Sequence, residues 1–283
     1  MSKQIVLDNY KQQIADLYNR RSDNYDDSQW HQRITHRLVE SAQISPGQDV
    51  LDVATGTGHV AIEVAQIVGS SGRVVGVDIA DRMLDQARRK IAALNLSNLE
   101  FQLADAETLD FLDNSFDRIL CAHAFPWIVD MEGVLRQWNR FLKPGGLVGV
   151  HTPADTAYVA DVVLQKVFAK YDVMLAGSSP IGTMEKLQNL LLKAGFTAVD
   201  IKTVEDEGKY ISLEQAKQKW DGISAPAFVQ SSHPLSQLSS EQLNQIKVEF
   251  DSELTALATN AGIWNDGTHF FAFGRKPANV ATI

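Results

Sequence analysis

Hydrophobic residues between positions 50 and 150 follow two alternating patterns. Short apolar runs rich in β-branched residues predict strands, and apolar residues spaced three and four apart predict helices. Five runs predict strands, at 50–54, 73–77, 99–103, 116–121 and 147–150. Helical stripes separate them, and one of these comprises Met83, Leu84, Ala87, Ile91 and Leu94. This alternation predicts a parallel sheet with right-handed crossovers, covered by helices on both faces.

The alternation loosens after residue 150. A strand is predicted near 198–204, and the run HFFAFG at 269–274 predicts a last strand. Between them the chain is mostly helical, and the tetrapeptides SLEQ and SSEQ match the capping box that begins many helices. The predicted organisation is an N-terminal helical lid over 1–45 and a core over 46–283 with cap insertions at about 155–182 and 209–263.

The insertions contain several aromatic residues, among them Phe168, Trp220 and Phe228. These side chains can be interpreted as the lining of an apolar or aromatic acceptor pocket. They can equally be interpreted as the core of the cap itself. The sequence leaves both interpretations open.

Composition and charge restrict the class of protein. The chain has 283 residues, of which 45% are hydrophobic and 22% charged, and its net charge of -9 argues against a nucleic-acid groove. A single cysteine, Cys121, excludes an intramolecular disulfide. The N-terminus has no signal-like apolar core, and no apolar stretch approaches the ~20 residues of a membrane-spanning helix. We expect a cytoplasmic monomer or homodimer that binds no nucleic acid and has no membrane span.

The stretch LDVATGTGHVAIEVA carries the clearest functional signal. Gly56, Gly58 and Ala61 fit the G-x-G-x-x-G/A fingerprint, which joins a strand to a helix that binds a dinucleotide. Asp78 ends the next predicted strand, 20 residues after Gly58, where a carboxylate can accept hydrogen bonds from a ribose diol. The pair favours a nucleoside-bearing cofactor over a ligand-free turn.

Asp52 distinguishes between nucleoside cofactors. A carboxylate beside a pyrophosphate in a partly desolvated pocket would be repelled by it. S-adenosyl-L-methionine (SAM) has no phosphate and carries a sulfonium and an ammonium, so the same carboxylate would attract it. An NAD(P)-dependent oxidoreductase remains an alternative on the fingerprint alone, and a non-catalytic SAM-binding protein is another.

Four ordered motifs, VLDVATGTG, VVGVDIADRML, FQLADAETLDFLDNSFDRI and NRFLKPGGLVGVHTP, cover roughly 45–153. The chain resembles the class I SAM-dependent methyltransferases there, and is similar to their ubiquinone/menaquinone and tocopherol group. The segment THFFAFGRKP resembles the antiparallel last strand of that fold. The resemblance implies an α/β, Rossmann-like fold with a seven-stranded, mostly parallel sheet, and S-adenosyl-L-homocysteine as product.

The same resemblance implies a set of cofactor contacts, most of them at strand ends: Tyr25, Asp52, Ala54, Thr55, Gly56, Gly58, Asp78, Ile79, Met83, Asp105, Ala106 and Cys121. Asp78 would hold the ribose hydroxyls, and Asp105 would accept a hydrogen bond from the adenine amino group. Asp105 could instead cap the turn that begins at Ala106. Tyr25 would belong to a segment that closes over the cofactor, and Cys121 would lie under the sulfonium.

Methyl transfer needs alignment and exclusion of water, because the cofactor supplies the reactive group. A hydroxyl acceptor also benefits from a base, and a base with a pKa near neutrality would be histidine. His123 and His151 follow predicted strands and are the candidates for catalysis, with His123 and Trp127 as candidate acceptor contacts. No metal-ligand spacing is present. The expected acceptor is an O, N or activated C atom of a small, aromatic or apolar metabolite of quinone or secondary-metabolite type.

The remaining histidines are assigned other roles. His233 would reach the pocket only if the inserted helical region folds over it. Packing or surface roles are expected for the others, His31, His36, His59 and His269.

Overall fold

The computed structural model describes residues 5–173, 175, 181–205, 208–222 and 238–278. The chain divides into two compact units. We call the first the sheet unit, which comprises Met1–Thr152, Glu185–Lys202 and Phe271–Ile283. The second is the insertion unit, which comprises Pro153–Met184 and Thr203–Phe270.

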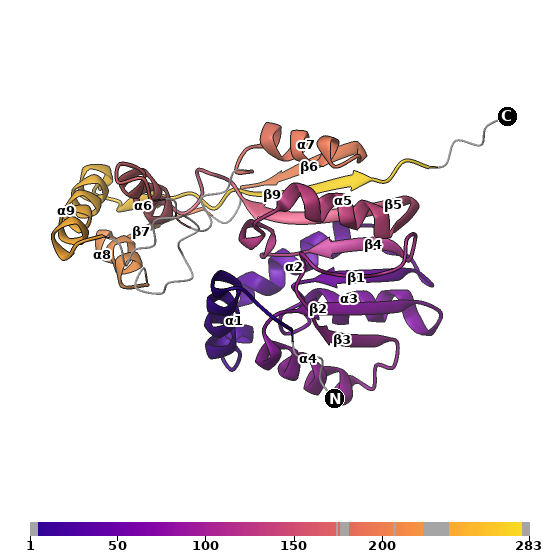
Figure 1. The fold of residues 1–283 in the computed structure, drawn as a ribbon. Coiled ribbons are helices and arrows are strands. Elements are labelled where there is room, and N and C mark those ends of the chain that lie inside the picture. Colours follow the sequence, from indigo (N-terminus) through magenta and orange to yellow (C-terminus); the bar gives the residue numbers. More distant parts are fainter. Residues whose placement is uncertain (1–4, 174, 176–180, 206–207, 223–237, 279–283) are drawn as a thin grey trace. The chain divides into compact units, whose positions relative to one another are not determined.

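The main sheet has seven strands in the order β3-β2-β1-β4-β5-β9-β6 (Figure 1). Their bounds are β1 Asp49–Val53, β2 Arg73–Asp78, β3 Leu99–Leu103, β4 Phe116–Cys121, β5 Leu142–Pro153, β6 Thr197–Val204 and β9 His269–Arg275. The strands from β3 to β5 pair in parallel. The sheet is mostly parallel with one antiparallel strand, so the predicted Rossmann-like methyltransferase fold is confirmed.

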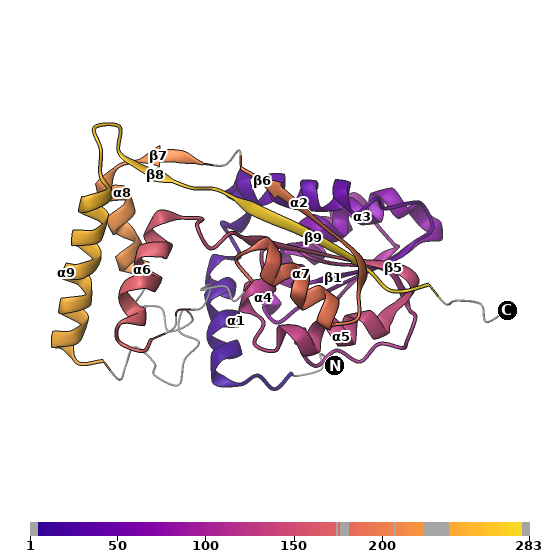
Figure 2. The ribbon, with the colours of Figure 1, turned by 90° about the horizontal axis from the view of Figure 1, so that it is seen from above.

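Helices cover both faces of this sheet, and Figure 2 shows α2 and α3 on one side of it and α5 and α7 on the other. Their bounds are α1 Asn9–Arg21, η1 Tyr25–Asp27, α2 Gln29–Ser41, α3 His59–Val68, η2 Gly69–Ser71, α4 Asp81–Leu94, η3 Phe125–Trp127, α5 Met131–Phe141 and α7 Met184–Lys193. Strands covered on both sides need apolar side chains on both faces. This explains why β1 is apolar and buried from Val50 to Val53 except for the buried carboxylate of Asp52.

The strand order reverses beside β1, and this reversal positions the site. From β1 the chain moves outward to β2 and β3 in one direction, and from β4 to β5 in the other. The loops that follow β1 and β4 therefore leave in opposite directions. They open a crevice at the carboxyl ends of the strands, where ligands bind in open α/β sheets.

The insertion unit is a small helical unit with a two-stranded sheet. Its elements are α6 Val159–Ala169, β7 Lys209–Ile211, α8 Leu213–Lys217, η4 Gln218–Gly222, α9 Ser240–Leu257 and β8 Ile263–Asn265. Capping boxes at Ser212 and Ser239 begin α8 and α9, as predicted. Phe168 stacks on Trp220 at 6.1 Å within the unit's own core. Phe228 and His233 lie outside the described residues.

Within the described residues, none of the helices is both long enough and apolar enough to cross a membrane.

Candidate functional site

The loop after β1 makes a tight turn through three left-handed residues. Ala54, Gly56 and Gly58 have φ values of 55°, 56° and 86°. The Thr55 N–H donates to the Val77 carbonyl at 2.9 Å and so attaches the loop to the end of β2. A side chain at Gly58 would lie 3.0 Å from the Phe101 ring. This glycine therefore permits close packing under the loop, whereas Gly56 lines the pocket above it.

Asp52 lies beneath the loop, not at its mouth, and this corrects the position expected from the sequence. Its side chain is buried, with the residue only 1% exposed, and it does not line the pocket. The carboxylate accepts hydrogen bonds from the Thr55 hydroxyl at 2.5 Å and from the Ala61 N–H at 3.1 Å. Burial raises the pKa of Asp52 to about 7. Asp52 thus joins the loop to the first turn of α3 through one carboxylate oxygen, Oδ2, which accepts both hydrogen bonds.

Asp78 is the second aspartate that the motifs pointed to, and unlike Asp52 it lines the pocket. One oxygen accepts from the Gly56 N–H and the other from the Ala80 N–H, each at 2.8 Å. Burial raises the pKa of Asp78 to about 6. A carboxylate has about four lone-pair sites, and two are used here. Each oxygen can therefore accept one further hydrogen bond, for example from one of two vicinal hydroxyls.

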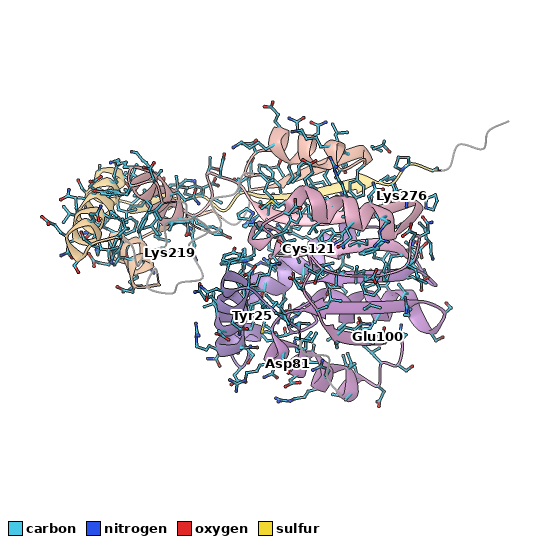
Figure 3. All side chains as sticks on the ribbon, viewed as in Figure 1. Tyr25, Asp81, Glu100, Cys121, Lys219 and Lys276 are labelled. Atoms are coloured by element: carbon cyan, nitrogen blue, oxygen red, sulfur yellow. The ribbon has the colours of Figure 1, made fainter. Side chains whose placement is uncertain are left out.

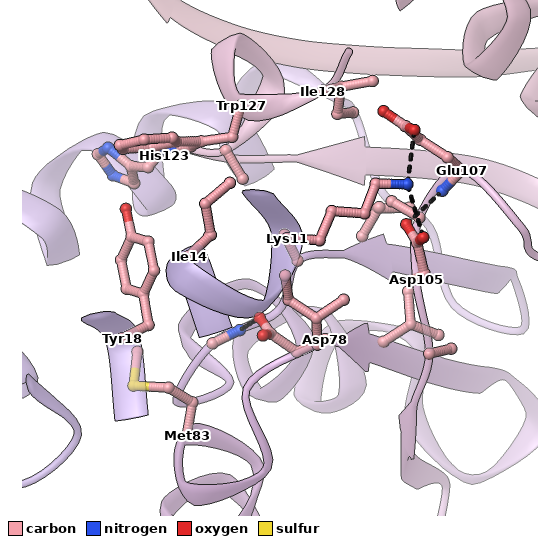
Figure 4. A pocket seen from close by; sticks show the side chains of 18 of the residues that line it. Lys11, Ile14, Tyr18, Asp78, Met83, Asp105, Glu107, His123, Trp127 and Ile128 are labelled. Carbon is pink, nitrogen blue, oxygen red and sulfur yellow. Dashed lines mark hydrogen bonds and ion pairs between the residues drawn. The ribbon is translucent and has the colours of Figure 1, made fainter. Parts of the chain in front are cut away.

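The pocket occupies about 820 Å³, including space open to solvent, in the sheet unit (Figure 4). Ten of the residues proposed from the sequence line it: Tyr25, Ala54, Gly56, Asp78, Ile79, Met83, Asp105, Ala106, His123 and Trp127. The other proposed residues, which do not line it, are Asp52, Thr55, Gly58, Cys121 and His151. Most of the lining therefore comes from strand ends that the motifs marked.

Cys121 and His151 lie behind the pocket wall. Cys121 is the last residue of β4 and is fully buried, and burial raises the pKa of its thiol above the usual range (Figure 3). His151 is also buried, and its Nδ1 accepts a hydrogen bond from the backbone N–H of His123 at 3.3 Å. The backbone of His123 has a φ of 60°, a strained conformation for a non-glycine residue. His151 therefore supports the His123 backbone from behind the pocket wall.

One end of the pocket contains an ion-pair cluster that the sequence did not reveal. Lys11, from α1, lies between Asp105 and Glu107, with Nζ–O distances of 2.7 and 2.6 Å (Figure 4). Asp105 also accepts from the Glu107 N–H at 3.0 Å, so it caps its own turn while facing the pocket. A single lysine on an amphipathic helix gives no sequence signal for a partner 94 residues away.

The segment that carries Tyr25 is attached to the glycine loop through the next residue, Asp26. Its carboxylate binds the Thr57 hydroxyl at 2.6 Å, His59 Nε2 at 2.8 Å and Lys90 Nζ at 2.5 Å. Burial alone would raise the pKa of Asp26, but these hydrogen bonds lower it below its usual range. The resemblance had pointed to Tyr25 only, and the anchoring contacts of Asp26 are a finding of the structure.

Aromatic rings surround His123. His31, expected to serve packing or the surface, stacks on Tyr25 with centroids 4.3 Å apart and lies 5.1 Å from His123. The Trp30 ring is 4.7 Å from His123, and Tyr18 meets Trp127 edge-on at 6.2 Å. Burial and the positive charge of Arg21 lower the pKa of His31 to about 4, so it is neutral near pH 7.

Charge and hydrogen bonding in the pocket fit SAM. The lining contains Asp78, Asp105 and Glu107 against one ammonium, that of Lys11. Such a lining favours a cationic ligand, and carboxylates accept from ribose hydroxyls and from an amino group. Among the described residues, no group of three or more His, Cys, Asp or Glu side chains is arranged to hold a metal ion.

Known proteins that are similar to this chain are methyltransferases. Residues 50–146 match a family described as a methyltransferase domain. The chain is 29% identical over 214 residues to a demethylmenaquinone methyltransferase of Bacillus cereus, covering 68% of this chain and 90% of that protein.

Solved structures share the fold. The [4+2]-cyclase SpnF superposes with a TM-score of 0.61 at 19% identity, covering 99% of this chain and 100% of that one. Haemonchus contortus phosphoethanolamine N-methyltransferase 2, in complex with phosphomonomethylethanolamine and S-adenosylhomocysteine, gives 0.56 at 19% identity, covering 88% of this chain and 53% of that one.

Residues 50–146 thus form a methyltransferase domain, and the chain is similar to the class I SAM-dependent methyltransferases, with SAM as the cofactor. Within that class its sequence is similar to the menaquinone group, as the ordered motifs indicated. The alternatives of an NAD(P)-dependent oxidoreductase and of a non-catalytic SAM-binding protein are not favoured.

Proposed function

We propose that the enzyme methylates an O, N or activated C atom of a small aromatic metabolite of the quinol or phenol kind. The observation that carries this proposal is the aromatic wall around His123, which adjoins the acidic part of the same pocket. Flat rings and aliphatic residues such as Ile14 and Ile128 suit an apolar planar acceptor. The similarity to a demethylmenaquinone methyltransferase supports the same substrate class.

The cofactor residues are assigned by the groups that they present. Asp78 would bind the ribose hydroxyls, and Ile79 and Met83 would pack on the adenine. Asp105 and the backbone of Ala106 would contact the adenine edge. The backbone of Ala54 and Gly56 would lie along the methionine arm. Asp52, Thr55 and Gly58 would act indirectly, because they shape the loop without lining the pocket.

SAM supplies a methyl group that is bonded to a positively charged sulfur. Because of this charge, the sulfur is a good leaving group when the acceptor attacks the methyl carbon in line. The protein's own contribution is to align the acceptor, exclude water and accept a proton. His123 is on the pocket wall and can take the proton of a hydroxyl acceptor. His151 would serve by holding the His123 backbone rather than by touching the acceptor.

We also propose that residues 1–45 form a lid, since Lys11, Ile14, Tyr18 and Tyr25 from this segment line the pocket. The prediction that the insertions cap the acceptor remains a prediction.

The proposal is tested by incubating the enzyme with SAM and a panel of phenols, quinols and amines, followed by mass spectrometry. A methylated phenol or quinol supports it, and methylation of aliphatic amines alone contradicts the acceptor class. With the best hydroxyl acceptor, His123→Gln should lower kcat by about 10²–10⁴-fold and leave SAM affinity unchanged. His36→Gln is the matched control, because His36 is 66% exposed and pairs only with Glu63 among the described residues. If kcat is unchanged in His123→Gln, His123 is not the base.

A further inference from the structure

Lys11 connects three segments that surround the pocket. Its ammonium binds Asp105 and Glu107, which follow β3, and so attaches α1 to that loop. Glu107 in turn accepts a hydrogen bond from the Val129 N–H at 2.6 Å, in the loop after η3. The three charged side chains are 9–16% exposed, so their interaction is only weakly screened by solvent.

The cluster also fixes the orientation of the Asp105 carboxylate. Its Oδ1 accepts from the Glu107 N–H, and its Oδ2 accepts from Lys11 Nζ at 2.7 Å. Without Lys11, the carboxylates of Asp105 and Glu107 would face each other with no cation between them. They would repel each other, and Asp105 would lose the contact that holds its outer oxygen. Each oxygen still has lone-pair capacity for one donor from a ligand.

We infer that Lys11 is a positioning residue for the cofactor: it holds the Asp105 carboxylate in the orientation that accepts the adenine amino group. This inference rests on the proposed assignment of Asp105 to adenine. Lys11 acts through Asp105, so it governs cofactor affinity and not the chemical step. Removing it should therefore raise the KM for SAM and leave kcat nearly unchanged.

The test is calorimetric binding of two ligands to the full-length protein. One is S-adenosyl-L-homocysteine, and the other is its purine analogue, in which hydrogen replaces the 6-amino group. The wild type should prefer the amino ligand by about tenfold, as expected for one hydrogen bond to a charged group. Lys11→Met should lose most of that preference, while its affinity for the purine analogue changes less than about twofold.

Two further variants separate positioning from folding. Lys11→Arg keeps the charge and should restore most of the preference. Lys166→Met is the matched control, because Lys166 forms an exposed ion pair with Glu253 in the insertion unit and should change nothing. Thermal unfolding of each apo variant reports whether α1 remains folded. If Lys11→Met lowers the affinity for both ligands equally, Lys11 only holds α1 in place and the inference is overturned.

A wrong assignment of Asp105 to the adenine amino group would give a different binding result. If the wild type binds the two ligands equally well, Asp105 does not accept from the adenine amino group. If the wild type discriminates and Lys11→Met discriminates equally, the assignment of Asp105 stands and Lys11 does not position it.

Discussion

The glycine loop after β1 and the N-terminal segment from α1 to η1 build the same pocket in different ways. The loop is held by its own flanking residues and by the end of β2: Asp52 binds the Thr55 hydroxyl and the Ala61 N–H, and the Thr55 N–H donates to the Val77 carbonyl. The N-terminal segment works through contacts between distant residues, such as the ion pair of Lys11 with Asp105. The loop is fixed by backbone hydrogen bonds and steric limits, whereas the segment is held mainly by side-chain charges.

This difference indicates which part of the pocket can open. Backbone conformations such as those of Gly56 and Gly58 are determined locally and stay in place without the lid. The contacts of Asp26 with the loop use side chains that are partly exposed, so each contributes modestly. We expect the loop to bind the cofactor and the N-terminal segment to set how long it stays.

The largest effect on cofactor binding is expected at Asp78. Asp78→Ala removes the acceptor proposed for the ribose hydroxyls and leaves the Gly56 and Ala80 N–H groups without their partner. Binding of S-adenosyl-L-homocysteine should weaken by about 100-fold, on the order of 2–3 kcal/mol, measured by calorimetry. Asp81→Ala, an exposed aspartate three residues later, should bind as the wild type does. Equal binding by Asp78→Ala and the wild type would show that the loop region does not hold the ribose.

A second effect, on stability and not on cofactor binding, is expected at Asp52. Its native pKa of about 7 lies above the ordinary 3.8, so the folded state binds more protons than the unfolded state between these values. The free energy of unfolding therefore falls as pH rises from about 4 to about 7, with a slope of up to ~1.4 kcal/mol per pH unit.

Asp52→Asn removes this titration, so the free energy of unfolding should fall less steeply with pH. The remaining fall would come from Asp78, whose pKa is about 6. Urea unfolding between about pH 5 and about pH 8 measures both slopes. Parallel curves for variant and wild type would mean that Asp52 is not protonated at neutral pH.

The smallest effect is expected at Asp26. Asp26→Asn keeps a partner for the Thr57 hydroxyl but loses the ion pair with Lys90 and the carboxylate charge beside His59 Nε2. Stopped-flow fluorescence should show S-adenosyl-L-homocysteine leaving about three- to tenfold faster, since exposed ion pairs contribute modestly. Asp85→Asn makes the same chemical change in an ion pair with Arg88 on α4 and should leave the dissociation rate unaltered. An unchanged rate in Asp26→Asn would remove the contrast between loop and lid.

Much of the sheet unit could be predicted, because its signals are local. All five strands expected between residues 50 and 150 are present, although β5 extends over Leu142–Pro153 and not only 147–150. Asp78 and Gly56 were found because a strand, a turn and a helix force their spacing. The position of Asp52 was wrong, since the sequence placed it in the right strand but could not show that its carboxylate turns back into the loop.

The sequence by itself determined the fold class and the strand ends from which most of the site is built, and its resemblance to the class I methyltransferases indicated the cofactor. Local sterics and apolar periodicity govern the fold class and the strand ends, because both depend on neighbouring residues. Only the tertiary structure decided that Lys11 joins Asp105 and Glu107, that Asp26 holds the glycine loop, and that His31 packs near His123. These contacts depend on how distant segments approach each other, and a charge on a helix surface does not specify its partner.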